Sequence, residues 1–393
     1  MLAIAETGLI NYNRWEMKQK KYLSRRESII TGKRKLESLY TFPNFPVFMG
    51  CTDEPFKNDL FADMEWVIDP GSGMIQLKKL LPLETLYKNQ HNDGTGKVWN
   101  DLYSEFAKFL VSFKPQKVLE IGGAHGRIAQ NYLDKVPQAS WTLVEPHPIV
   151  NDKRIKVVKR WFNDKFTFNQ EIDTLVHSHF FEHLYNPVQF LETVYKFLKP
   201  GQNHAFAIPK LHDFLKKKFT NALNFEHTFF LTEYFMDYLL QKTGFKIVKK
   251  QTFGDNHSIF YLTRKDKSRT VKLRNKYKSY KKIFMNFVNF HLDMVKRLNK
   301  LIVKSKEPVY LFGAHIFSQY LIGFGLNTKR IVSVLDNSPM KQGKRLYGTR
   351  FNVESPGVLK NGGKTNLILK AGPYNEEIKK DILENVNPEV NFL

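Results

Sequence analysis

The chain has 393 residues, of which 42% are hydrophobic and 14% aromatic, enough for two folded cores and a smaller module. Its 61 Lys and Arg against 38 Asp and Glu give a net charge of +23, which suits an anionic partner (a phosphorylated substrate, a nucleic acid or a membrane surface) or reflects compositional bias. A single cysteine, Cys51, excludes an internal disulfide and a cysteine-rich zinc site, and no apolar run is long enough to span a bilayer.

Residues 1–110 are expected to form an N-terminal module. The apolar start, Met1–Glu6, breaks too early for a signal peptide, which predicts a cytoplasmic protein. Residues 1–40 are basic and weakly patterned, so we expect them to be helical or partly disordered. Pro, Gly and aromatic residues from Tyr40 to Leu86 indicate a small irregular module, and residues 87–110 have a helical pattern.

Residues 111–265 alternate strand and helix patterns, which predicts a doubly wound α/β sheet. Asn186 before Pro187 predicts a helix start, and Lys199-Pro-Gly201 predicts its end. The last two strands are hairpin-like. The seven expected strands are Lys117–Ile121, Trp141–Glu145, Ile155–Val158, Thr174–His177, His204–Ile208, Lys246–Gln251 and Ser258–Thr263.

A helical linker and a second α/β domain are expected to follow. Residues 266–307 are rich in Lys, with apolar residues at helical spacing, so we expect an amphipathic helix between two domains rather than on a membrane surface. Residues 308–393 open with a strand, a Gly turn, a helix and a strand that ends at Asp336. This order repeats the first α/β unit weakly and predicts a second Rossmann-like domain.

The most informative segment is Val118–Gly126, where a buried strand enters a glycine turn before a helix that begins at Arg127. Glycines let a backbone approach a ligand, and a helix start offers free N–H groups. Glu145 ends the next apolar run, where an acid can bind ribose hydroxyls. The pattern predicts a nucleoside site, and NAD enzymes share such loops.

Residues 120–126 (Glu-x-Gly-x-Ala-x-Gly) resemble the loop of class I S-adenosylmethionine-dependent methyltransferases, and Asp173–His183 with Leu198–Gly201 extends the resemblance. It implies S-adenosylmethionine as cofactor, and Trp161 or Phe162 beside its adenine. His177, His179 and His183 are either structural or ligand-facing, and His179 is our choice for the cofactor. The candidate cofactor residues are Glu120, Gly122, Gly123, Ala124, Gly126, Glu145, Pro146, Trp161, Phe162 and His179.

Asn224-Phe-Glu-His227 resembles the Tyr-x-Glu-His segment of the sugar C-methyltransferases that act on deoxysugar nucleotides. The resemblance implies that Glu226 and His227 lie beside the attacking atom. Asn224 replaces the family tyrosine, which favours O-methylation by one base over C-methylation, with N-methylation as a further alternative. His227 is the candidate general base, and Glu226 orients it or binds sugar hydroxyls. A capping Glu-His before a helix is the structural alternative.

The region from Phe312 to Pro356 resembles the C-terminal domain of the same family, which implies that it borders a nucleotide-sugar site. The N-terminal module resembles the family's zinc domain in outline only. With one cysteine we expect no metal, and aromatic and Pro residues in its structural role. The candidate substrate-binding residues are His91, His183, His257, His315 and Lys341.

Together, the patterns and these resemblances imply a methyltransferase acting on a small-molecule sugar, nucleotide-activated, for surface polysaccharide such as capsule or for a glycosylated metabolite. A nucleic-acid methyltransferase is the second interpretation, prompted by the charge, but the basic residues are spread along the chain and no nucleic-acid partner is expected. A non-catalytic cofactor-binding protein is the third, prompted by the missing zinc cysteines and Asn224. The sequence leaves the oligomeric state open.

Overall fold

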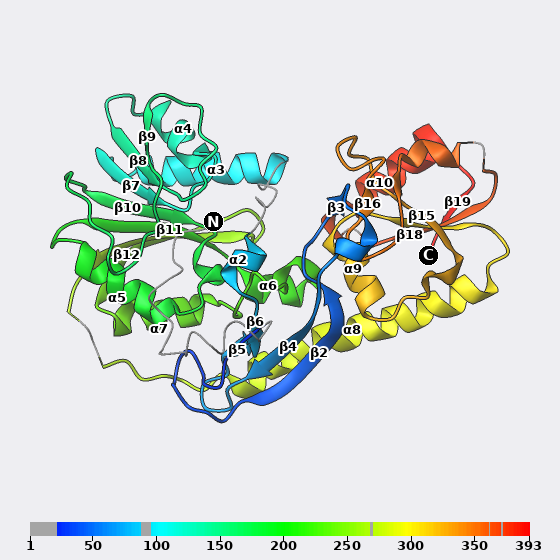
Figure 1. Ribbon diagram of the computed structural model, residues 1–393, viewed down its shortest axis with the longest axis horizontal. Helices are drawn as coiled ribbons and strands as arrows, with labels where there is room; N and C mark the ends of the chain where they lie inside the picture. The colour runs from blue at the N-terminus through cyan, green and yellow to red at the C-terminus, as the bar shows by residue number, and fades with distance from the viewer. Residues whose placement is uncertain (1–21, 88–95, 268–269, 361, 371) are drawn as a thin grey trace.

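The computed structural model describes residues 22–87, 96–267, 270–360, 362–370 and 372–393. Two separate α/β sheets lie at opposite ends of the molecule, and the long helix α8 (Tyr277–Lys304) runs along one side toward the second sheet (Figure 1). The N-terminal strands lie between the two sheets, against α8. Among the described residues, no helix combines the length and the apolar character that crossing a bilayer requires.

The large sheet has seven strands in the order β12-β13-β11-β10-β7-β8-β9. All neighbours are parallel except β13, which runs antiparallel to β11 and β12. The order and the antiparallel strand confirm the predicted class I methyltransferase sheet. The strands are β7 (Lys117–Ile121), β8 (Ser140–Val144), β9 (Ile155–Val158), β10 (Thr174–Ser178), β11 (Asn203–Pro209), β12 (Phe245–Phe253) and β13 (Ser258–Lys265).

Helices cover both faces of this sheet because its strands are apolar on both sides. Val118 packs in one core with α3 (Lys97–Val111) and α4 (Arg127–Leu133), whereas the next residue, Leu119, packs in the other core with α5 (Pro187–Phe197) and α7 (Glu233–Lys242). Asn186 Oδ1 accepts a hydrogen bond from Gln189 N at 3.1 Å, so α5 begins at the predicted cap.

The N-terminal region differs from the sequence prediction. Residues 22–40 contain no helix; instead β1 (Leu23–Ser24) pairs with β6 (Lys79–Leu80), and β2 (Glu37–Pro46) begins a three-stranded antiparallel sheet with β4 (Phe61–Ile68) and β5 (Ile75–Leu77). The expectation of an irregular module was therefore wrong. The β2–β4 pairing has two register shifts, and the one between Phe42 and Phe45 contains Pro43, so the strand continues where the proline suggested a turn.

The second sheet has five parallel strands in the order β17-β15-β14-β18-β19. Its strands are β14 (Val309–Phe312), β15 (Ile331–Leu335), β17 (Val353–Glu354), β18 (Thr365–Leu369) and β19 (Val390–Phe392). Helices α9 (Ile316–Gly323) and α10 (Asn375–Asp381) connect them. The remaining short elements are β3 (Cys51–Thr52), β16 (Arg345–Leu346), α2 (Leu83–Leu86), α6 (Leu211–Lys216), η1 (Phe56–Asn58), η2 (Phe181–His183), η3 (Thr220–Ala222), η4 (Thr328–Arg330), η5 (Pro356–Leu359), η6 (Gly372–Tyr374) and η7 (Ile382–Val386).

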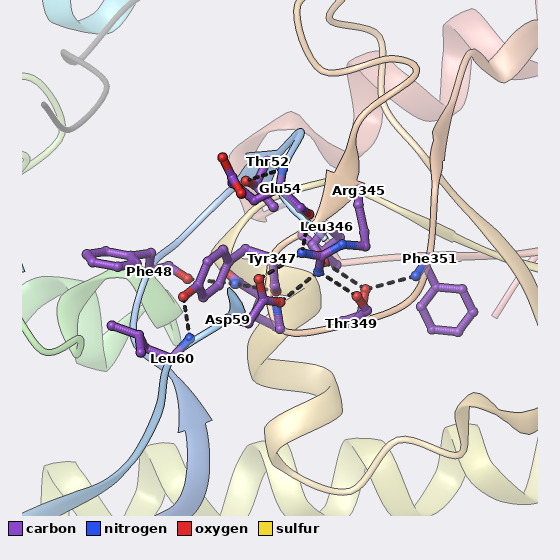
Figure 2. Close-up of polar contacts among 12 residues, drawn as sticks. Phe48, Thr52, Glu54, Asp59, Leu60, Arg345, Leu346, Tyr347, Thr349 and Phe351 are labelled. Atoms are coloured by element: carbon purple, nitrogen blue, oxygen red, sulfur yellow. Dashed lines mark hydrogen bonds and ion pairs between the residues drawn. The ribbon is translucent and has the colours of Figure 1, made fainter. Parts of the chain in front are cut away.

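A buried ion pair ties the N-terminal module to the second α/β unit. Arg345 donates through both Nη atoms to the two oxygens of Asp59, each at 2.7 Å, and the Asp59 side chain is fully buried (Figure 2). Gly348 N also donates to Asp59, and Leu60 N donates to Tyr347 Oη at 2.6 Å. Aromatic contacts continue this junction, where Phe42 packs edge-on against Tyr320.

Candidate active site

The glycine loop follows β7 at the carboxyl edge of the large sheet. Gly122 and Gly126 have φ values of 73° and 65°, a left-handed conformation that favours glycine. A Cβ on Gly123 would lie 2.5 Å from the carboxyl carbon of Glu120, so this position also requires glycine. Ala124 is accommodated, and its carbonyl accepts a hydrogen bond from Ile149 N at 2.9 Å.

Two buried carboxyl groups lie at this edge, at the positions predicted for cofactor binding. Glu120 accepts a hydrogen bond from Trp141 Nε1 at 2.9 Å, and burial raises its pKa to about 7 against the opposing effect of that bond. Glu145 follows β8 and accepts a hydrogen bond from His147 N at 3.1 Å. Adjacent strands therefore bring the loop and a candidate ribose-binding acid together.

The structure separates the two predicted adenine contacts. The Phe162 ring is fully buried and packs against Phe166, Phe190 and Phe197 with centroids 5.2–6.2 Å apart. Trp161 is half-buried, and so is Pro146 after the second strand. Because core packing occupies the Phe162 ring, Trp161 is the stronger candidate of the two.

His179 sits just beyond β10 with a left-handed φ of 47°, a conformation that a non-glycine residue adopts at a cost and that often marks functional sites. Its Nε2 and the Nδ1 of His257 lie 3.0 and 2.8 Å from the same hydroxyl, that of Ser258. The Trp99 ring contacts both imidazoles. Burial holds the pKa of His179 well below its usual value, so the ring is neutral.

The sequence analysis assigned no role to Trp99 or Ser258. Trp99 sat in a region recognised only as helical, and a serine that opens a strand carries no signal of its own. Only the sheet order, which places β13 beside β11, brings Ser258 to the end of β10.

A second group, here called the histidine cluster, comprises Tyr87, Glu182, His183, Glu226 and His227. His183 Nδ1 lies 3.4 Å from Tyr87 Oη and 3.8 Å from Glu226 Oε2, and its Nε2 lies 3.8 Å from Glu182 Oε1. The His183 and His227 ring centroids are 5.2 Å apart. The fold thus unites residues from three separated segments. The sequence analysis singled out three of them (His183, Glu226 and His227), whereas Tyr87 and Glu182 had no assigned role.

The local backbone fixes the tautomer of His227. Its Nδ1 lies 2.9 Å from the Ala222 carbonyl oxygen, which can only accept, so Nδ1 carries the proton and Nε2 keeps its lone pair. Burial lowers its pKa to about 4, partly offset by that hydrogen bond. Asn224 Oδ1 accepts from the N–H groups of Glu226 and His227 at 2.8 and 2.7 Å, so Asn224 shapes the turn that presents both side chains.

Glu182 makes the cluster chemically versatile. Burial raises its pKa to about 8, so the carboxyl group is largely protonated at neutral pH. The ligand atoms of Glu182, His183 and His227 lie within 4.8 Å of one another, a spacing that suits either a divalent cation or a proton-transfer network. The expectation that no metal takes part stays a prediction.

The other substrate candidates divide between locations. His183 belongs to the histidine cluster and His257 to the Ser258 pair, whereas His315 and Lys341 lie in the second α/β unit. Lys341 Nζ donates to Asp336 at 2.9 Å, and burial lowers the pKa of His315 to about 4. His91 lies outside the described residues.

Comparison with known proteins supports this description of the large sheet. Residues 91–250, two fifths of the chain, match the family model for a methyltransferase domain. No curated protein matches the chain. Similar solved structures include human N-acetylserotonin methyltransferase with S-adenosylmethionine (16% identity, 42% of this chain, 53% of that one, TM-score 0.35).

Two further structures align over similar lengths. The Streptomyces davawensis N,N-8-amino-8-demethyl-D-riboflavin dimethyltransferase is 19% identical, over 42% of this chain and 55% of that one, with a TM-score of 0.35. A glycopeptide N-methyltransferase complexed with S-adenosylmethionine is 13% identical, over 45% of this chain and all of that one, with a TM-score of 0.34.

The sheet order, the glycine loop and the family match identify residues 91–250 as a methyltransferase domain, for which S-adenosylmethionine is the cofactor. The resident groups fit that cofactor, since a loop of three glycines with two left-handed turns follows β7 and the buried acid Glu145 stands at the end of the next strand. The resemblance to sugar C-methyltransferases stays a prediction.

Proposed function

We propose that this methyltransferase transfers the methyl group to a hydroxyl oxygen of a sugar, nucleotide-activated and destined for surface polysaccharide, with His227 as the general base. The observation that carries the proposal is the state of His227. Its Nδ1–H is committed to the Ala222 carbonyl, which leaves the Nε2 lone pair free of the proton, and its ring lies 5.2 Å from that of His183 in the histidine cluster.

The reaction needs alignment and one proton acceptor. Bound S-adenosylmethionine supplies an electrophilic methyl group. The hydroxyl oxygen forms the new C–O bond as the C–S bond breaks, and the hydroxyl proton passes to Nε2 of His227. Because His227 is neutral well below pH 7, it is available as an acceptor throughout the physiological range.

Neighbouring groups fit a polar, hydroxyl-rich acceptor. Glu226 and Glu182 approach His183 within 3.8 Å, and a protonated Glu182 can donate to a sugar oxygen while the carboxyl oxygens of Glu226 can accept from a sugar hydroxyl. The Asn224 side chain is engaged with the backbone of its own turn. This arrangement supports a single-base O-methylation, and C-methylation and N-methylation are the alternatives that the experiment separates.

The test is mass spectrometry of a panel of nucleotide sugars incubated with the protein and methyl-deuterated S-adenosylmethionine. We expect one labelled sugar, with fragmentation that places the label on oxygen. A label on carbon or nitrogen would replace O-methylation by the corresponding alternative. Transfer to RNA or DNA instead, with steep salt dependence, would favour the nucleic-acid interpretation.

His227→Asn should lower turnover by roughly 100-fold or more, the usual scale for losing a general base. S-adenosylhomocysteine affinity, measured by calorimetry, should remain within error. The matched control is His212→Asn, a half-buried histidine on α6 whose ring packs against Tyr280. Near-normal turnover of His227→Asn would remove His227 from the mechanism.

Metal removal distinguishes the two uses of the Glu182–His183–His227 group. A proton network needs no ion, so turnover after EDTA treatment and gel filtration should equal that of the untreated protein. Loss of activity that Zn²⁺ or Mg²⁺ restores would show that the cluster holds a cation and would contradict the role assigned to His227.

A further inference from the structure

Helix α8 leaves one face open to solvent along its whole length. Its apolar residues, from Tyr280 to Ile302, recur at helical spacing and are buried in the core that the N-terminal module and both α/β units share. At about 3.6 residues per turn, the exposed polar residues fall on the opposite side of the helix. This side, here called the basic face, consists of Lys278, Ser279, Lys282, Asn286, Asn289, Asp293, Lys296, Arg297, Lys300 and Lys304.

The basic face belongs to the most highly charged part of the chain. Residues 272–306 contain eleven Lys and Arg and a single acid, Asp293, so this segment carries +10 of the net charge of +23. Among the described residues, no Asp or Glu forms an ion pair with any cation of the basic face, whereas Lys281, beside it on the helix, pairs with Glu37. Cations that the fold does not neutralise are available to an external anion.

The spacing of these cations is unfavourable for the helix itself. Lys278 and Lys282 are four residues apart, and the same interval separates Lys296, Lys300 and Lys304 in succession. Like charges at this spacing lie one turn apart and repel each other, so each pair destabilises the helix. An anionic surface laid along the helix would neutralise the whole row and remove this repulsion.

Apolar side chains border the basic face on both sides. Phe290 and Leu301, three turns apart on one edge, are 42% and 46% exposed, and Leu292 and Val303 on the other edge are 37% and 61% exposed. RNA would neutralise the cations but would leave these side chains in water. A bilayer surface accepts both kinds of group, because lysine ammonium groups reach the lipid phosphates while neighbouring apolar groups enter the boundary with the acyl chains.

We propose that the basic face of α8 docks on the surface of a bilayer that contains anionic lipids. The row of cations from Lys278 to Lys304 is about 40 Å long, which suits an extended surface rather than a small ligand. Lipid phosphates contact the cations, and the bordering apolar side chains enter the headgroup region, so the helix lies on the bilayer without crossing it. The inference is drawn from α8 alone and is independent of the proposed methyl acceptor.

The test is co-sedimentation of the full chain with lipid vesicles. Vesicles of phosphatidylcholine are compared with vesicles in which about one third of the lipid is phosphatidylglycerol. We expect binding to the anionic vesicles only, weakened roughly tenfold or more in about 0.5 M salt because salt screens the attraction. Equal binding to neutral vesicles, or no binding to either kind, would overturn the proposal.

A charge variant locates the binding on α8. Lys296→Gln/Arg297→Gln/Lys300→Gln removes three cations from the basic face and should weaken binding to anionic vesicles about 100-fold, which is the usual scale for three basic residues at an anionic membrane. All three side chains are exposed, so thermal unfolding should be unchanged.

The matched control removes the same number of exposed charges elsewhere. Lys135→Gln/Lys153→Gln/Lys156→Gln changes residues that lie near α4 and β9, at the far side of the large sheet from α8 (Figure 1). Its affinity for anionic vesicles should stay within about threefold of the parent protein. An equal loss in the two triple variants would show that net charge, rather than α8, directs the binding, and would overturn the proposal.

Leu301→Gln/Val303→Gln distinguishes a bilayer from a nucleic acid. This variant changes no charge, so it would not affect RNA binding, whereas the loss of two apolar groups from the headgroup region should weaken vesicle binding about tenfold. Unchanged vesicle affinity would overturn the proposal, and RNA binding that the charge variant abolishes would then assign the basic face to nucleic acid. Because sedimentation requires no methyl transfer, failure of the proposed function leaves this test intact.

Discussion

At the scale of single residues, the cofactor loop shows how packing restricts sequence. Glu120 lies beneath the loop, held by Trp141, and leaves no room for a side chain at the loop's second glycine. Ala124 stands where the family pattern has a glycine, and its carbonyl accepts a hydrogen bond from Ile149 N. Substitutions at Gly123 and at Ala124 are therefore expected to differ in their effect on cofactor binding.

Gly123→Ala should weaken S-adenosylmethionine binding. Its Cβ would meet the Glu120 carboxyl carbon at 2.5 Å and the Leu143 side chain at 2.8 Å, so the loop or the carboxyl group must shift. We expect a loss of about tenfold to 100-fold in affinity, equivalent to about 1.4–2.8 kcal/mol, by calorimetry. Ala124→Gly is the matched control and should bind within about threefold of the parent protein. Unchanged affinity for Gly123→Ala would mean that the loop is looser than its packing indicates.

The sequence could locate single residues of the site but not their partners. Glu226 and His227 stood out because their segment resembles a family motif. Ser258 and Glu182 did not, because their role comes from a hydrogen bond or a burial that only the folded sheet produces. Phe162 was predicted from the sequence to contact the adenine, but its ring packs in the core against residues such as Phe197.

At the scale of elements, the sequence predicted the strands of the large sheet but missed the N-terminal strand β2. Most strands of the large sheet are apolar runs between turn signals, and the strand ends fell within a residue or two of prediction. The N-terminal strand β2 was missed because its two prolines break the pattern, and bulges that tolerate them depend on pairing with β4.

An unusual pair of histidines joins β10 to β11. His177 Nε2 and His204 Nε2 lie 3.0 Å apart in the core, and neither Nδ1 has a partner among the described residues. Burial holds the pKa of His177 well below its usual value and lowers that of His204 to about 3. The unfolded chain, with an ordinary histidine pKa near 6.5, therefore binds protons that the native state does not.

This pair should make the protein sensitive to acid. Stability is fully present above pH 6.5 and falls as the pH drops from 6.5 toward 3, by about 2 kcal/mol per histidine at pH 5. In the double variant His177→Leu/His204→Leu, the loss of unfolding free energy between pH 7 and pH 5 should shrink by up to about 4 kcal/mol. Urea unfolding at several pH values measures this.

Exposed His147→Leu is the control for the histidine pair, because it removes a histidine from the surface rather than from the core. At pH 7 the double variant should be near-neutral in stability, since it removes two partially satisfied polar groups together. A double variant with the parent's pH slope would show that the acid sensitivity arises elsewhere.

At the scale of the whole molecule, the second α/β unit supports the candidate active site through direct contacts. Tyr320 Oη on α9 donates to the carbonyl of Leu223, the residue before the Asn224 turn. Gln319 on the same helix donates to Phe48 and Tyr347, which joins α9 to the N-terminal module. The sequence predicted two α/β units but not this junction, because Asp59 and Arg345 are far apart in the chain and carry no motif.

Asp59→Asn tests this junction. Removing the carboxylate leaves Arg345 buried without its counter-charge, which typically costs about 3–5 kcal/mol, so the urea midpoint should fall with little change in slope. Turnover should fall as well, since the α9 contact with Leu223 depends on the same packing. Asp53→Asn is the matched control because Asp53 also pairs across the junction, with Lys344 at 3.4 Å, but its side chain is 76% exposed.

The control pair should contribute about 0–1 kcal/mol, as exposed ion pairs do. If both variants lose the same small amount of unfolding free energy, the attraction between Asp59 and Arg345 only balances the cost of desolvating them. The N-terminal module is then held by its aromatic contacts, such as that between Phe42 and Tyr320. If Asp59→Asn loses stability but keeps turnover, the second unit holds the fold without shaping the Asn224 turn. Only a coupled loss shows that the junction positions the candidate base.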